Sequence, residues 1–151
     1  MKILVDADAC PLAVKQILYK TVKRLKVELV LVANQFLRVP SSPLIKSLIV
    51  SAGADVADDK IVEIMEKGDL VISADIPLAD RVIKKEGFVL DPRGKFLTDV
   101  NIGERLASRN LFEELRSVGV ETGGPNSYNS KDKQEFANQL DKFLTRTLNQ
   151  K

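Results

Sequence analysis

Short apolar runs alternate with amphipathic stretches over the first 90 residues of the chain. The apolar runs are bounded by polar or turn residues, which is typical of strands buried on both faces of a parallel sheet. Apolar positions three and four residues apart predict helices between most of these strands. We expect a three-layer α/β fold whose mostly parallel, five-stranded sheet has the order 3-2-1-4-5. The expected strands are near 3–5, 28–33, 47–50, 69–73 and 87–90, and the expected helices near 11–24, 58–68 and 77–86.

The last third of the chain has a different pattern. Beyond residue 92 the alternation stops, and the remaining sequence reads as helical. Asn101 followed by Glu104 resembles a capping box and predicts a helix over 101–118, while Ser130 is a candidate cap for a last helix. We expect one domain over 1–151, with a sheet core over about 1–91 and a helical C-terminal extension over about 92–151.

Aspartates stand at the ends of two predicted strands. Asp6 ends the first strand and Asp75 follows the fourth, and in the expected order these strands are neighbours about 4.8 Å apart. Their carboxylates then lie at the carboxyl edge of the sheet, where α/β folds bind ligands. Because aspartate is depleted in strands, a purely structural role explains these two residues poorly.

Three further aspartates are candidates that also have ordinary alternatives. Asp8 points the same way as Asp6 if the strand conformation persists, but it can equally cap the following helix. Asp58 and Asp59 open the helix before the fourth strand, where acidic residues also stabilise the first turn. Carboxylates gathered in one crevice repel each other, so either some stay protonated or a divalent cation binds among them. Oxygen ligands alone favour Mg²⁺ or Mn²⁺.

The chain contains no histidine and one cysteine, Cys10. This composition excludes Ser-His-Asp and Cys-His catalysis, His-ligated zinc and a structural zinc site of the usual kind. A lone cysteine cannot form an internal disulfide, and no apolar run approaches the roughly 20 residues that span a bilayer. We therefore expect a cytoplasmic protein without a membrane segment. The net charge of +2 permits nucleic-acid binding without arguing for it.

Three residues are candidate substrate contacts. Asn34 ends the second predicted strand and can orient a water or a phosphate, although a turn role fits it equally well. Arg93 and Arg109 follow the sheet and are candidates for a phosphate-binding rim, with simple solvent exposure as the ordinary alternative.

Several stretches of the sequence are distinctive in combination: VDADACP (5–11), LVAN (31–34), ADVADDKIV (54–62), DLVISADIPLADRV (69–82) and NIGERLASR (101–109). In this order, and over nearly the whole chain, they resemble the YaiI/YqxD family of uncharacterised bacterial proteins. That family distantly resembles the PIN-like nucleases, whose metal-binding acids lie at the carboxyl ends of strands in a small α/β sheet. Carried over by position, the resemblance implies metal-site roles for Asp6, Asp8, Asp58, Asp59 and Asp75.

The sequence departs from the PIN-like pattern in one region. PIN-like nucleases usually carry an acidic residue, often glutamate, after the second strand, whereas residues 34–50 contain none. Either Asp58 or Asp59 replaces the missing acid, or the metal site is incomplete.

Three functions are open at this point. The first is a Mg²⁺- or Mn²⁺-dependent nuclease acting on RNA or single-stranded nucleic acid, in which Asp6 and Asp75 hold the metal and Asp8 orients the attacking water. Asp58 or Asp59 would complete that site. The second is a phosphatase of the haloacid-dehalogenase type, with Asp6 as nucleophile and Asp8 as general acid. The third is a non-catalytic protein that uses the acidic pocket to bind a metal or a partner.

Overall fold

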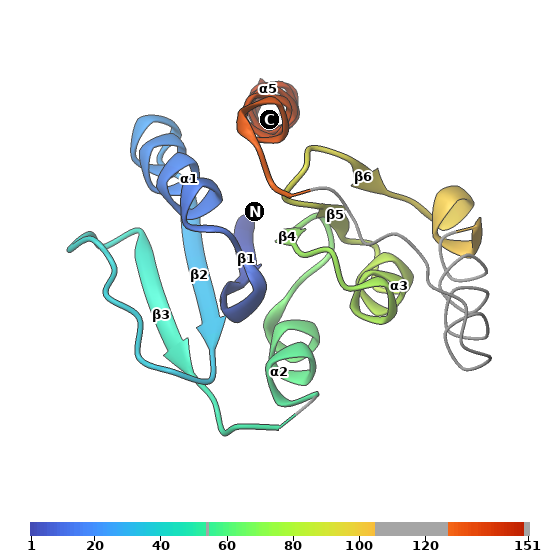
Figure 1. Cartoon of the computed structure of the whole chain (residues 1–151), viewed down its shortest axis with the longest axis horizontal. Helices are drawn as coiled ribbons and strands as arrows, with labels where there is room; N and C mark the ends of the chain where they lie inside the picture. Colours follow the sequence, from blue (N-terminus) through green and yellow to red (C-terminus); the bar gives the residue numbers. More distant parts are fainter. Residues whose placement is uncertain (54, 105–126, 150–151) are drawn as a thin grey trace.

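A six-stranded sheet in the order β3-β2-β1-β4-β5-β6 runs through the part of the chain that the structure describes (Figure 1). The structure is a computed structural model and describes residues 1–53, 55–104 and 127–149. β1 to β5 pair in parallel, and β6 pairs antiparallel to β5. The strands are β1 (Lys2–Asp6), β2 (Glu28–Ala33), β3 (Ile45–Ile49), β4 (Leu70–Ile72), β5 (Phe88–Leu90) and β6 (Phe96–Leu97).

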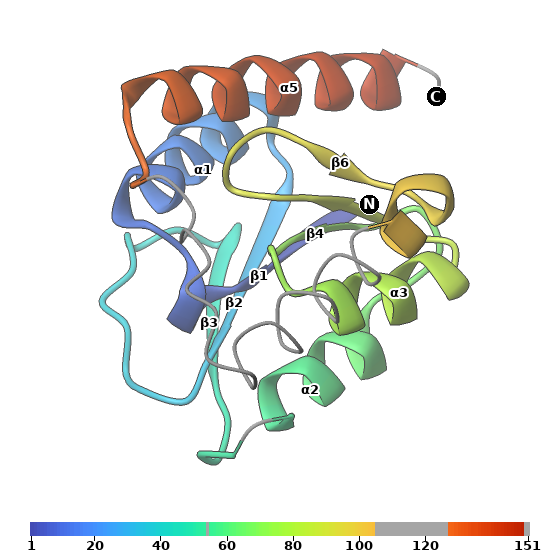
Figure 2. The same cartoon turned by 45° about the vertical axis from the view of Figure 1, so that its right-hand side comes forward.

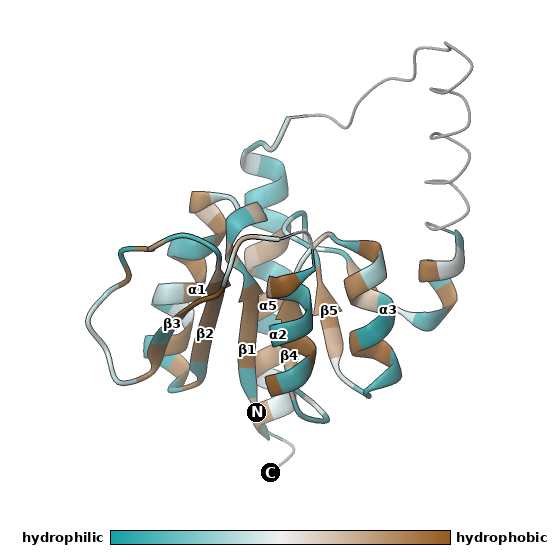
Figure 3. Ribbon diagram, turned by 90° about the horizontal axis from the view of Figure 1, so that it is seen from below, coloured by the Kyte–Doolittle hydropathy of each residue, from teal (hydrophilic) through white to brown (hydrophobic). Residues whose placement is uncertain are grey.

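Helices cover both faces of this sheet. α1 and α5 lie on one face and α2 and α3 on the other (Figure 2). Successive strand residues point to opposite faces, so Ile3 and Val5 pack toward α1 and α5 while Leu4 packs toward α2 and α3. The strands are accordingly apolar along their length, as Figure 3 shows for the centre of the sheet. The helices are α1 (Leu12–Leu25), α2 (Val56–Ile64), α3 (Ile76–Lys84) and α5 (Ser130–Asn149), with a short 3₁₀ helix, η1 (Ala7–Ala9), after β1.

The predicted order of the strands is confirmed, but the sheet contains one strand more than predicted. The five expected strands occur in the order 3-2-1-4-5, but β6 (Phe96–Leu97) extends the sheet beyond β5. The expectation that the chain is purely helical after residue 92 is therefore wrong. Two residues are too few to show the alternation that identifies a strand.

The turn between β5 and β6 holds the additional strand, β6, in place. The Asp91 carboxylate accepts hydrogen bonds from the backbone N–H groups of Arg93 and Lys95, at 2.9 and 3.0 Å. Gly94 has φ of +90° and lies directly against the backbone of α5. The Tyr128 hydroxyl donates to the carbonyl of Pro92 at 2.9 Å. The turn thus joins the sheet to the start of α5.

Two helix starts differ from the predicted ones by their capping residues. Asn129, not Ser130, caps α5, because Asn129 and Asp132 exchange side-chain-to-backbone hydrogen bonds, both 3.1 Å long. Thr98 and Asn101 form the same reciprocal pair at 2.8 and 3.2 Å, so the helical turn there begins at residue 99. The rest of the predicted helix over 101–118 falls mostly outside the described residues. Within the described part, no helix combines the length and apolarity needed to cross a membrane.

Candidate acidic site at the carboxyl edge of the sheet

Asp6 and Asp75 lie at the carboxyl ends of β1 and β4, close enough for their charges to interact. The two strands are direct neighbours in parallel register, with Val5 opposite Ile72. Asp6 is the last residue of β1, and Asp75 follows β4 by three residues and caps α3. One oxygen of Asp75 accepts from the backbone N–H of Leu78 at 2.9 Å, so this carboxylate has a structural role in addition to any other.

Ser73 connects the two aspartates and was not identified from the sequence. Its hydroxyl oxygen accepts from the backbone N–H of Asp75 at 3.0 Å. The same hydroxyl hydrogen-bonds the Asp6 carboxylate, which favours the ionised form of Asp6. Ser73 is almost fully buried, so it holds both residues in a defined arrangement. A serine two positions before a strand-end aspartate is the only sequence signal that indicates this link.

The charges of these carboxylates influence one another. Burial raises the pKa of Asp6, and the negative charges of Asp75 and Asp8 raise it further. Burial also raises the pKa of Asp58, with contributions from Asp75 and Asp6, to about 6. Ionisation of Asp6 and of Asp58 is therefore opposed first by burial and then by the negative charge of neighbouring carboxylates.

Asp58 and Asp59, adjacent in the sequence, have different surroundings. Both lie in the first turn of α2, which begins at Val56 rather than at Asp58. Asp58 is half-buried beside the Asp6 and Asp75 charges, whereas Asp59 is exposed and forms an ion pair with Arg81 on α3 at 2.8 Å. Asp58 is thus the member of the pair that belongs to the acidic site. The helix period points adjacent residues about 100° apart, so it separates Asp58 from Asp59 but does not show from sequence which of the two faces the site.

Asp8 has neither of the two positions expected from the sequence. The strand conformation does not persist beyond Asp6, because the chain turns into η1 (Ala7–Ala9). Asp8 does not cap α1 either, since the cap position is Pro11 and has no side-chain hydrogen bond. Instead its carboxylate accepts from the backbone N–H of Asn34 at 2.7 Å. Asn34 therefore contributes its main chain to the site, and its side chain is exposed.

The carboxylate oxygens of this site are suitable ligands for a hard divalent cation, but the described side chains do not form a complete binding site for one. Among residues 1–53, 55–104 and 127–149, no three acidic or cysteine side chains stand close enough together to hold a metal ion. Mg²⁺ is commonly held by only one or two carboxylates, with waters and substrate phosphate completing its coordination. Asp6 and Asp75, with Asp58 at the side, are compatible with that kind of binding.

The two candidate arginines lie in different situations. Arg93 extends from the β5–β6 turn, pairs with Asp132 of α5 at 2.9 Å and lies 6.0 Å from the centre of the Tyr128 ring. These contacts give Arg93 a role in docking α5. Arg109 falls outside the described residues, so its candidacy as a substrate contact stays a prediction.

Comparison with known proteins places the chain in a family without an assigned activity. A family model described as "Uncharacterized BCR, YaiI/YqxD family" matches residues 4–146. A UPF0178 protein of Maridesulfovibrio salexigens is 58% identical over 149 residues, covering 99% of both chains. A UPF0178 protein of Cupriavidus necator is 56% identical over 146 residues, covering 97% of this chain and 95% of the relative. No solved structure matches the chain. The chain belongs to the YaiI/YqxD family of uncharacterised proteins.

Proposed function

We propose that the protein is a Mg²⁺- or Mn²⁺-dependent nuclease that hydrolyses phosphodiester bonds in RNA or single-stranded nucleic acid. One observation carries the proposal: Asp6, Asp75 and Asp58 come from three separate elements, and each of the first two raises the pKa of the third. Such mutual repulsion costs stability, and a bound cation removes the cost. The distant PIN-like resemblance supports the same reading, because nucleases of that kind place their acids at this edge of the sheet.

Each residue of the site has a distinct role in this proposal. Asp6 and Asp75 would hold the metal directly, and Asp58 would complete the site through a metal-bound water, in the place of the acid that residues 34–50 lack. The bound metal would supply activation of a water and neutralisation of charge on the phosphodiester. Asp8, held by the backbone N–H of Asn34, would orient the attacking water.

A nucleic-acid substrate is supported by the loop that follows β2. This loop begins at Asn34, beside Asp8, and alternates in exposure: Leu37 and Val39 pack against the core while Phe36 and Arg38 face solvent. Phe36 is 80% exposed, the largest fraction among the large apolar side chains of the described residues. A flat aromatic ring with a nearby cation is the combination on which unpaired bases stack.

The test compares three variants on a panel of RNA and DNA oligonucleotides with Mn²⁺ present. Asp6→Asn keeps the side-chain shape and should lower the turnover number at least about 100-fold, as loss of a metal-positioning group does. Asp59→Asn is the matched control and should retain turnover, because the Asp59 side chain is exposed and pairs with Arg81. Phe36→Ala should weaken oligonucleotide binding roughly tenfold while leaving turnover at saturation unchanged.

A second measurement separates the proposal from its rivals. Mn²⁺ should raise the melting temperature of the unaltered protein and of Asp59→Asn, but not that of Asp6→Asn. Cleavage that survives in Asp6→Asn would contradict the proposal. A phosphate analogue trapped covalently on Asp6 would instead identify a phosphatase.

A further inference from the structure

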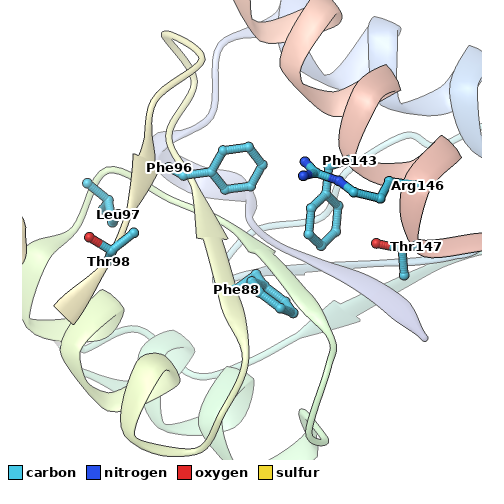
Figure 4. A pocket seen from close by; sticks show the side chains of 7 residues that line it. All are labelled: Phe88, Phe96, Leu97, Thr98, Phe143, Arg146 and Thr147. Carbon is cyan, nitrogen blue, oxygen red and sulfur yellow. The ribbon is translucent and has the colours of Figure 1, made fainter. Parts of the chain in front are cut away.

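A cavity of about 340 Å³ lies between the C-terminal half of α5 and the β5–β6 hairpin (Figure 4). Its walls come from the two strands of that hairpin and from α5, which follows much later in the sequence. Phe88 opens β5, Phe96 lies on β6, and Phe143, Arg146 and Thr147 lie on α5. The lining comes from the β6 end of the sheet and from α5, and it includes none of Asp6, Asp58 and Asp75. It therefore does not belong to the acidic site.

Three of the seven lining residues are phenylalanines. The Phe143 ring packs edge-on against Phe88, with centroids 5.1 Å apart, and against Phe96 at 5.4 Å. Phe143 is largely buried, but Phe88 remains 46% exposed although it is a large apolar residue of an inner strand. The cavity thus offers ring faces and edges that are not fully covered by the chain. Planar apolar groups gain contact area and favourable ring geometry at such a surface.

A cation stands at the rim of this apolar cavity. Arg146 follows Phe143 by three residues on α5, which places both on one side of the helix. In Figure 4 the Arg146 side chain extends from α5 in the direction of Phe96. No ion pair joins Arg146 to a carboxylate of the described residues, whereas Arg24, which also contacts α5, pairs with Asp141 at 2.7 Å. The hydroxyls of Thr98 and Thr147 are the other polar groups in the lining.

We propose that this cavity binds a small planar aromatic carboxylate. The ring of the ligand would pack against Phe88, Phe96 and Phe143, and its carboxylate would meet the Arg146 guanidinium, which is suited to bind it through two parallel hydrogen bonds. A volume of about 340 Å³ lies within the range of small-molecule sites, which are mostly apolar with a few placed polar groups. The proposal is independent of the nuclease activity.

The experiment titrates 2-naphthoate, and separately the neutral analogue 2-naphthalenemethanol, into the ¹⁵N-labelled full chain and follows amide shifts by NMR. We expect saturable shifts from both compounds at residues of β5, β6 and the second half of α5, with the carboxylate binding more tightly. Arg146→Gln should weaken naphthoate binding at least fivefold and leave the alcohol unaffected. Phe88→Thr removes one ring from the lining but keeps a residue that favours strands, and it should weaken the binding of both compounds.

Arg24→Gln is the matched control, because it removes the same charge from an exposed arginine that contacts the same helix away from the cavity. It should bind naphthoate as the unaltered chain does. The proposal is overturned if naphthoate gives no saturable shifts at these residues, or if Arg24→Gln weakens binding as much as Arg146→Gln. It is also overturned if Arg146→Gln, with an unchanged melting temperature, binds naphthoate normally.

Discussion

Asp58 shows at the scale of one residue how the acidic site affects stability. Its pKa is about 6 in the folded protein against 3.8 for an ordinary aspartate. Below pH 3.8 both the folded and the unfolded chain hold the proton, so no cost arises. As the pH rises toward 6, the unfolded chain releases its proton first, and the free energy of unfolding falls. Above pH 6 the cost is constant.

Replacing Asp58 with Asn removes this cost. In metal-free buffer we expect the Asp58→Asn variant to match the unaltered protein at pH 3 and to be more stable at pH 7. Solvent screening of this half-buried group limits the gain to about 1 kcal/mol. Urea unfolding at the two pH values measures it. Asp59→Asn is the control, since it loses the exposed ion pair with Arg81 and should gain nothing. Equal gains in both variants would point to overall charge and contradict a specific cluster.

The residues of the site were predictable to the extent that strand ends define them. Asp6 and Asp75 follow from the apolar runs and the strand order, because parallel neighbours end at one edge of the sheet. The Asp8 contact with the Asn34 backbone and the bridging hydroxyl of Ser73 were not predictable, because both depend on how the chain turns after a strand. Asp58 faces the site while Asp59 pairs with Arg81, because of the way α2 packs against α3. No local sequence pattern encodes that packing.

At the scale of elements, the contact between the β5–β6 turn and α5 rests on Gly94. A Cβ atom at this position would lie 2.7 Å from the backbone carbon of Glu135 and 2.8 Å from the backbone nitrogen of Phe136, and φ is +90°. Gly94→Ala therefore combines backbone strain with a clash against helix backbone, and should lower the free energy of unfolding by about 2–4 kcal/mol.

The matched control for Gly94 is Gly68, which has φ of +88° but no atom within 4 Å of an added Cβ. Gly68→Ala should show the backbone strain alone, about 1–2 kcal/mol. Chemical unfolding of the two variants beside the unaltered chain separates the two contributions. Equal losses in both variants would show that the close approach of α5 contributes nothing.

The elements themselves were predictable in proportion to their length and regularity. The long amphipathic helices and the buried strands follow from periodicity, and the strand order follows from the common topology of parallel α/β sheets. β6 was missed because its two residues carry no period, and the start of α5 was misplaced by one residue because Ser130 and Asn129 are both good caps. The contact of Gly94 with α5 joins parts of the chain about 40 residues apart, so only the folded structure reveals it.

At the scale of the whole molecule, α5 closes the core on the α1 face of the sheet. Four of its side chains are buried there: Phe136, Leu140, Phe143 and Leu144. Burial of such side chains contributes roughly 1.5–3 kcal/mol each, or roughly 6–12 kcal/mol together. This is comparable to the roughly 5–15 kcal/mol by which a whole domain is stable. The sheet and α5 are therefore expected to fold as one unit, in agreement with the single domain predicted from the sequence.

A chain that ends at residue 129 tests this expectation, with a chain ending at residue 149 as the control that keeps all of α5. The shorter chain exposes the α1 face of the sheet and should lose both the dispersed amide NMR spectrum and the cooperative urea transition, because the lost burial equals most of the stability available. The control should retain both. A cooperative transition in the shorter chain would mean that the sheet is an independent domain. In that case the cavity beneath α5 would lie between two units, and the acidic site, built only from residues before 76, would function without it.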